Sequence, residues 1–334
     1  FEMIKFSVNT HRGCFGGCNF CTIAAHQGKF IQSRSEESII KEITALNGLP
    51  GFAGNISDVG APTANMYGMK GKNQELCAKC RRKSCLFPVP CKNMDRSHER
   101  LLKLYERIAK VKGIRHAYIG SGIRYDLFLD EKGFVDETSY PYLKELILEH
   151  TSGRLKVAPE HTNDSVLKLM RKPSFKQFED FKQLFDKINN EKGLKQQLIP
   201  YFISSHPGCK ESDMAELAIH TKKLNFHLEQ VQDFTPTPMT MSTEMYYTGY
   251  NPYTLEQVFA AHSKEEKLAQ RKYFFWYENE YKQDIIKSLH RIKRYDLLNE
   301  LYPGISGKNY VANKPYPKQQ TNNTLRIKNK KNIN

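Results

Sequence analysis

The chain has 334 residues, of which 39% are hydrophobic, and its formal net charge is +15. A chain of this length can bury one large core with appendages, which excludes a small disulfide-stapled scaffold. No apolar run approaches the roughly 20 residues of a transmembrane helix, so we expect a cytoplasmic protein without a membrane partner. The positive charge fits a nucleic-acid partner, although a compositional bias across a proteome would have the same effect.

The first predicted unit is a strand over 3–9, a glycine-rich loop over 11–21 and a helix that follows Ser35. Ser35 suits the N-cap of this helix, and two acidic residues follow it in the first turn. An apolar stripe with helical spacing comes next: Ile39, Ile40, Ile43 and Leu46. The chain therefore opens with a strand, a loop and a helix.

The same alternation continues, mostly with helical patterns between the strands. The further predicted strands are 54–59, 117–121, 155–158, 197–204 and 229–234. Six strands that alternate with helices predict an α/β fold with a parallel sheet, curved or closed as a partial TIM-type (β/α)6 barrel. Active-site residues would then follow the C-terminal ends of the strands.

The predicted organisation is a core over 1–240, a cysteine-rich insertion over 64–98 and a C-terminal helical extension over 241–311. Residues 312–334 are rich in Lys and Asn and contain no acid, so we expect a basic, disordered tail. The sequence starts at Phe1, inside a segment that already reads as a buried strand. We therefore expect it to begin within a longer protein.

Three cysteines of the glycine-rich loop, Cys14, Cys18 and Cys21, are close enough in sequence to hold one cluster. A [4Fe-4S] cubane normally takes four cysteines, so three ligands leave one iron open to bind something else. A structural zinc, completed by His11 or His26, is the alternative that this spacing allows.

The pattern Cys-x3-Cys-x2-Cys after a first strand resembles the signature of radical S-adenosylmethionine (SAM) enzymes. From about Glu2 to about Pro303, the chain is similar to the YgiQ-type proteins of that superfamily. This resemblance implies a radical-SAM barrel whose open iron chelates SAM. It also implies reductive cleavage of SAM to a 5′-deoxyadenosyl radical, with an external electron donor such as flavodoxin or ferredoxin. The motifs do not identify a substrate.

The resemblance also implies roles for residues near the first two strand ends. Phe20, just before the third cysteine, corresponds to an aromatic residue that packs near the adenine. The superfamily often has Gly-Gly-Glu after the second strand, where this chain has Gly60, Ala61, Pro62 and Thr63. Because the glutamate is missing, the contact with the methionyl amine would fall to backbone carbonyls or to Thr63.

Later strand ends are similar to those of radical-SAM methylthiotransferases. Ser121 and Arg124 follow the third strand, and Arg124 suits either a ligand carboxylate or a salt bridge to a neighbouring acid. Glu160 is implied to bind the ribose hydroxyls, and His161 beside it is a candidate proton donor. Ser204 lies near the implied adenine site.

A second cysteine group consists of Cys77, Cys80, Cys85 and Cys91. Four thiolates in one short polar segment suit either a structural zinc or an auxiliary iron-sulfur cluster. The eighth cysteine, Cys209, stands alone after a strand end, where it is either a reactive thiol and candidate catalytic residue or a small buried residue.

Two functions follow from these features. The first is a radical SAM enzyme with a [4Fe-4S] cluster and SAM as cofactors. The alternative is a non-catalytic, metal-stapled RNA-binding module in which both cysteine groups are structural. Iron content distinguishes them, because only the enzyme needs about four irons on the first group.

Overall fold

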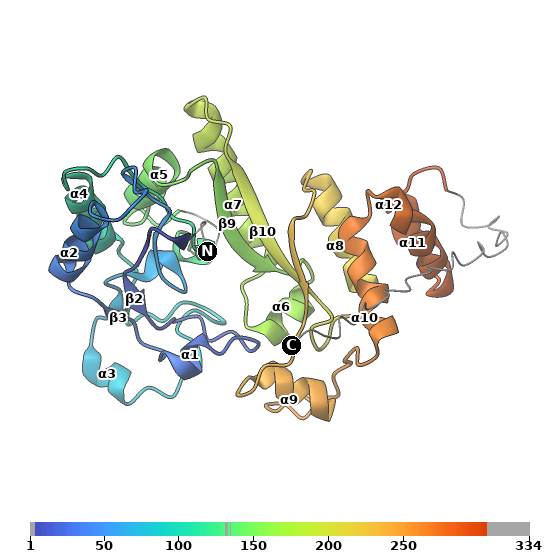
Figure 1. The fold of residues 1–334 in the computed structure, drawn as a ribbon. Helices are drawn as coiled ribbons and strands as arrows, with labels where there is room; N and C mark the ends of the chain where they lie inside the picture. The colour runs from blue at the N-terminus through green and yellow to red at the C-terminus, as the bar shows by residue number, and fades with distance from the viewer. Residues whose placement is uncertain (1–3, 131–132, 134, 306–334) are drawn as a thin grey trace, which may run out of the picture.

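A computed structural model describes residues 4–130, 133 and 135–305, which form a mixed α/β fold (Figure 1). All six predicted strand regions contain strands, so the predicted α/β class is confirmed. The strands in these regions are β1 (Ser7–Asn9), β4 (Asn55–Ile56), β5 (Asp58–Gly60), β8 (His116–Ala117), β9 (Arg154–Glu160), β10 (Gln197–Ser204) and β11 (Gln230–Asp233).

The strands pair in parallel and follow the order of the chain. β1 pairs with β5, β4 pairs with β8, and β9, β10 and β11 form one three-stranded sheet. A parallel bridge between Ile123 and Val157 connects the segment after β8 to β9. Within the described residues no pairing joins β11 to β1, so the partial TIM-type barrel stays a prediction.

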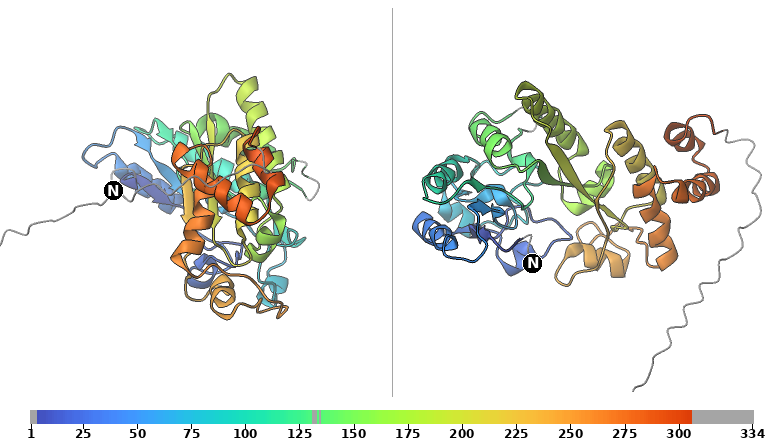
Figure 2. Two further views of the ribbon diagram at one scale, coloured as in Figure 1. Left: turned by 90° about the vertical axis from the view of Figure 1, so that its right-hand side faces the viewer. Right: turned by 45° about the horizontal axis from the view of Figure 1, so that its top comes forward.

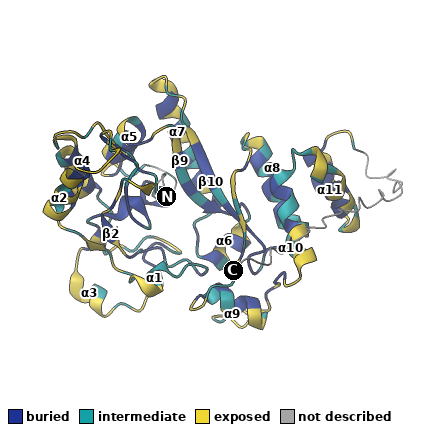
Figure 3. Cartoon of the chain, viewed as in Figure 1, coloured by how far each residue is buried: buried dark blue, intermediate teal, exposed yellow. Residues whose placement is uncertain are grey.

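The third strand is shorter than predicted, because the backbone after Ala117 bonds irregularly. The amide of Tyr118 donates to the carbonyl of Ile56, whereas the amide of Ile119 donates to that of His150. The longer strands β9 and β10 are largely buried (Figure 3).

Helix α2 (Glu36–Leu46) confirms the first predicted helix. Ser35 caps it, since its hydroxyl accepts the amide of Ser38 at 3.2 Å. Ile39, Ile43 and Leu46 are buried, as the stripe predicts. The other helices between strands are α4 (Glu99–Ala109), α5 (Tyr140–Glu149), α6 (Asp164–Met170), α7 (Phe175–Glu191) and α8 (Glu211–Lys223), with the 3-10 turn η3 at Tyr125–Leu127.

The insertion packs on the first cysteine loop. It contains η2 (Ala64–Met66), a two-stranded ladder of β6 (Lys70–Gly71) and β7 (Met94–Asp95), and α3 (Gln74–Ala78). A small apolar cluster holds it in place and includes residues from outside the insertion: Phe15, Met66, Met69, Cys85, Leu86, Met94 and Leu127.

The C-terminal part of the described chain is mainly helical. It comprises α9 (Met241–Thr248), α10 (Lys264–Arg271), η4 (Lys272–Phe275), α11 (Asn279–Arg291) and α12 (Tyr295–Leu301). The elements η4, α10 and α12 contact α8, and they gather at its side of the molecule (Figure 2). No helix in the described ranges is long and apolar enough to cross a membrane. The predicted basic tail and the first residues of the predicted opening strand lie outside the described residues.

Candidate cofactor site at the cysteine loop

The first three cysteines lie on the loop between strand β2 (His11–Arg12) and helix α1 (Ile23–His26). After α1 the chain returns as β3 (Gln32–Ser33), which pairs with β2 in a short ladder. Two of its glycines have left-handed backbone conformations, Gly13 with φ 90° and Gly17 with φ 58°. A Cβ at Gly17 would lie 2.3 Å from the carbonyl oxygen of Lys83. The loop therefore bends where a side chain would be strained, and it touches the insertion directly.

The three sulfurs lie in different environments, and within the described residues only Cys18 has a cation beside it that favours the thiolate. Cys14 Sγ lies 3.4 Å from Thr63 Oγ1, and Cys18 Sγ accepts a hydrogen bond from Arg124 Nη1 at 3.6 Å. Burial, with the nearby thiols of Cys18 and Cys14, raises the pKa of Cys21 to about 11. All three are free and half-buried, and soft sulfur donors with a cation beside one of them fit an iron-sulfur cluster.

Arg124 is paired with an acid that the sequence analysis did not identify. Its Nε donates to Asp126 Oδ1 at 2.9 Å, and both side chains are less than 10% exposed. The sequence left two roles open for Arg124, a contact with a ligand carboxylate and a salt bridge to a neighbouring acid. The structure shows the salt bridge. Gly16 makes room for the guanidinium, because a Cβ there would lie 2.5 Å from Arg124 Nη1.

The ends of the second and third strands are bound to each other. Asn65 donates its amide hydrogen to the carbonyl of Arg124 and accepts the backbone amide of Arg124, both at 2.9 Å. Thr63 is buried, and its carbonyl lies 3.1 Å from His11 Nε2. These bonds hold Thr63 and Arg124 against the cysteine loop, where the resemblance places both.

Ser121 and Gly60 serve the packing of the strands. The hydroxyl of Ser121 donates to Asp58, whose Oδ1 also accepts the amides of Gly120 at 2.9 Å and Ser121 at 3.0 Å. A Cβ at Gly60 would lie 2.6 Å from Ser121 Oγ. The hydroxyl hydrogen of Ser121 is therefore already used. Pro62, in the turn that follows, is half-buried.

Glu160 ends β9 in a left-handed conformation, with φ 71°. Its side chain is 10% exposed and lies 3.9 Å from the ammonium of Lys172, which the sequence analysis missed. Burial raises the pKa of this carboxyl, while Lys172 and Arg124 oppose the shift. Among the described residues none donates a hydrogen bond to the Glu160 carboxylate, so its acceptor capacity is free for a ligand.

His161 and Cys209 form a fully buried pair. The amide of Asn163 donates to His161 Nδ1 at 3.0 Å, which leaves the proton on Nε2, 3.4 Å from Cys209 Sγ. Burial lowers the pKa of His161 to about 3 and raises that of Cys209 well above its usual value. A neutral imidazole that donates to a buried thiol fits a structural role. The proposed catalytic roles of both residues stay predictions.

Phe20, which belongs to the loop, and Ser204, at the end of β10, have different partners. The ring of Phe20 packs edge-on against that of His206, with ring centres 6.2 Å apart, just after β10. Ser204 is fully buried, and its hydroxyl donates to Asp233 Oδ1 at 2.5 Å. Phe20 thus lies at the loop's contact with the fifth strand region, whereas Ser204 joins β10 to β11.

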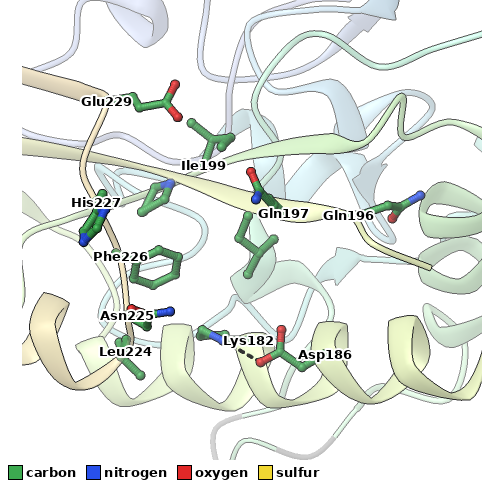
Figure 4. A pocket seen from close by; sticks show the side chains of 12 residues that line it. Lys182, Asp186, Gln196, Gln197, Ile199, Leu224, Asn225, Phe226, His227 and Glu229 are labelled. Carbon is green, nitrogen blue, oxygen red and sulfur yellow. Dashed lines mark hydrogen bonds and ion pairs between the residues drawn. The ribbon is translucent and has the colours of Figure 1, made fainter. Parts of the chain in front are cut away.

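Two cavities can be compared with this site. One of about 590 Å³ opens beside Cys18 and Cys21. Another of about 430 Å³ lies at the opposite, N-terminal end of β10, where Lys182 and Asp186 face Gln197 (Figure 4). Because active sites of such sheets lie at the C-terminal strand ends, the cavity beside the cysteines is the candidate.

The second cysteine group lies next to the first. The amide of Cys85 donates to the carbonyl of Phe15 at 3.0 Å, and Lys29 Nζ lies 3.9 Å from Cys80 Sγ. Asn93 Nδ2 donates to Cys77 Sγ at 3.2 Å, and the amide of Cys91 donates to the carbonyl of Cys85. In the described part of the chain no three or more Cys, His, Asp or Glu side chains are arranged around a metal position. A metal on either cysteine group therefore stays a prediction.

Sequence comparisons reveal close relatives. The chain is 59% identical over 304 residues to a UPF0313 protein of Bacteroides thetaiotaomicron, covering 90% of this chain and 49% of the relative. It is 48% identical over 273 residues to the UPF0313 protein YgiQ of Escherichia coli K12, covering 80% and 36%. The chain thus spans about half or less of the length of these relatives. Residues 229–304 match the family model "Domain of unknown function (DUF3362)".

The comparison with solved structures gives weaker likenesses. TsrM of Kitasatospora setae, a radical SAM methyltransferase solved with cobalamin and a [4Fe-4S] cluster, is 15% identical with a TM-score of 0.42, covering 72% of this chain and 39% of TsrM. Methylornithine synthase (PylB) is 12% identical with a TM-score of 0.39, covering 80% and 61%.

Proposed function

We propose that this chain, a close homologue of the UPF0313 (YgiQ-type) proteins, is the catalytic core of a radical SAM enzyme. The observation that carries the proposal is the cysteine loop itself. Three free thiols on one short loop lie at the strand ends, beside a cavity and next to a buried guanidinium. A three-cysteine site leaves one iron of a [4Fe-4S] cluster open for SAM.

In this proposal, Cys14, Cys18 and Cys21 ligate the cluster. When bound, the cluster and SAM would supply an electron and a 5′-deoxyadenosyl radical. Arg124 donates toward Cys18 and so stabilises negative charge on that sulfur, while Asp126 fixes the orientation of the guanidinium. The hydroxyl of Thr63 lies 3.4 Å from Cys14 Sγ. It would form a hydrogen bond with the amino acid part of SAM, as donor or as acceptor.

Glu160 is proposed to accept hydrogen bonds from the ribose of SAM. Its carboxylate is nearly buried and accepts no bond among the described residues, so a hydroxyl donor would satisfy it. Lys172 stabilises the ionised form of this carboxylate. Phe20, with one edge against His206, is proposed to contact the adenine.

Two further components belong to the proposal. An external donor such as flavodoxin or ferredoxin would reduce the cluster. The second cysteine group would bind zinc or an auxiliary iron-sulfur cluster; its contact with Phe15 would then support the first loop.

The test replaces Cys14, Cys18 or Cys21 singly by Ala in anaerobically purified protein. Each variant should lose the brown colour, most of about four irons per chain, and 5′-deoxyadenosine formation from SAM with dithionite. Cys209→Ala, outside the loop, is the matched control and should retain its iron. A colourless wild-type protein that holds only zinc would favour the RNA-binding module instead.

A further inference from the structure

The cavity beside Cys18 and Cys21 has a basic rim. Its lining includes five cationic residues and no acid: Lys29, Arg81, Arg82, Lys83 and Arg171. They come from the segment after α1, from the insertion and from the end of α6. Three separate segments therefore bring positive charge to one opening, and none of them brings negative charge.

Some of these cations hold the protein together, and others are available. The guanidinium of Arg82 donates to the carbonyls of Ser84, Phe87 and Val89, and the ammonium of Lys29 donates to the carbonyl of Arg82. By contrast, Arg81 and Lys83 are exposed and pair with no acid among the described residues.

Arg171 lies over an aromatic ring at the same opening. Its guanidinium carbon is 4.7 Å from the ring centre of Tyr253, and Tyr253 is 50% exposed. Arg171 itself adopts a left-handed conformation, with φ 56°. Met239 beside it is 68% exposed. The opening thus combines free cations with planar and apolar surface.

The segment that contains Met239 and Tyr253 exposes further large apolar side chains. Residues 239–259, which include α9, expose six large apolar side chains: Met239, Tyr247, Tyr250, Tyr253, Leu255 and Phe259. Such clustering on one segment is typical of an interaction surface.

We infer that the substrate of this site is a single strand of nucleic acid, whose phosphates contact Arg81, Lys83 and Arg171 while a base stacks on Tyr253. Cations along a backbone path with exposed aromatic rings are the chemistry that binds single strands. An acidic peptide would use the cations but would not need the exposed part of the Tyr253 ring. This substrate class rests on the proposed function.

The experiment measures fluorescence anisotropy of a fluorescein-labelled uridine oligonucleotide with the whole 334-residue chain, under anaerobic conditions. The triple variant Arg81→Ala, Lys83→Ala, Arg171→Ala should weaken binding and reduce the slope of log affinity against log salt by about two, since each phosphate contact on a single strand contributes about 0.7. The matched control Lys110→Ala, Lys112→Ala removes exposed charge elsewhere and should change the affinity much less.

Stacking is tested separately. Tyr253→Ala should weaken oligonucleotide binding by about tenfold, whereas Tyr295→Ala, another partly exposed tyrosine, should not. Parallel titrations with the deoxyuridine oligonucleotide distinguish RNA from DNA. All variants keep residues 306–334, so the basic tail contributes equally to each.

Three results would overturn the inference: no binding at low salt, equal weakening by the lysine control, or tighter binding of poly-glutamate or of duplex at the same residues. Iron content and 5′-deoxyadenosine formation are measured on the same samples. If cleavage occurs but the oligonucleotide does not bind, only the substrate class is wrong. If binding follows the prediction but no cleavage occurs, the proposed function is wrong.

Discussion

Replacing Asp126 by Asn should destabilise the apoprotein strongly, because it leaves the guanidinium of Arg124 buried without its counter-ion. Both side chains are less than 10% exposed, and two contacts join them, Nε to Oδ1 at 2.9 Å and Nη2 to Oδ2 at 2.5 Å. The arginine cannot escape by losing its proton, since its pKa lies well above any working pH.

The magnitude follows from the geometry. Two unit charges about 3 to 4 Å apart attract by about 4 to 6 kcal/mol at an effective dielectric constant of about 20. Breaking a buried pair by removing one partner costs about 3 to 5 kcal/mol. We therefore expect Asp126→Asn to lower the free energy of unfolding by about 3 kcal/mol or more, measured by urea denaturation of iron-free protein.

The double variant Arg124→Met, Asp126→Leu separates charge from packing. It removes both charges and keeps apolar volume, so its free energy of unfolding should lie within about 1 kcal/mol of wild type. If the cation also serves the cluster, the same variant should hold iron less well although it is folded. A cost below about 1 kcal/mol for Asp126→Asn, or a double variant as unstable as the single one, would refute this reasoning.

Three other outcomes are expected. Gly17→Ala should lower the free energy of unfolding by about 1 to 3 kcal/mol in urea denaturation, because the new Cβ would clash with the carbonyl of Lys83. The control Gly51→Ala should cost less, because Gly51 has a similar φ of 79° but nothing within 4 Å of its Cβ position. Glu160→Gln should weaken SAM binding in calorimetry about tenfold or more while the cluster absorbance stays unchanged; equal affinity would move the ribose contact elsewhere. Acid should destabilise the fold through its buried histidines. Burial lowers the pKa of three of them, His98, His150 and His206, from 6.5 to about 3 or 4. Between about pH 6.5 and 4 the unfolded state binds more protons, so the free energy of unfolding should fall by about 1.4 kcal/mol per pH unit for each histidine; a flat profile from urea denaturation across that range would contradict this.

Local patterns predicted the parts of the fold that depend on local physics. The cap at Ser35 and the stripe over α2 are signals within a few residues, and both are confirmed. The positions of the six strand regions were predictable for the same reason. The length of β8 was not, because its bonding depends on His150, which lies on a distant segment.

The candidate site contains partners that sequence reasoning missed. Asp58, Asp126 and Lys172 carry no motif, and each acts through a neighbour: Asp58 through Ser121, Asp126 through Arg124 and Lys172 through Glu160. Asp126 is only two residues from Arg124, and that spacing was the one available signal. The other two pairs are formed by tertiary packing.

The insertion has packing partners that its own composition does not reveal. It contains few apolar residues, and its own sequence does not indicate where they pack. The structure supplies apolar partners from elsewhere, since Phe15 and Leu127 complete its small core. Cys85 bonds to Phe15, and Gly17 lies against Lys83, so the insertion and the first cysteine loop share one packing unit. Through this shared packing, a disturbance at one cysteine group can be transmitted to the other.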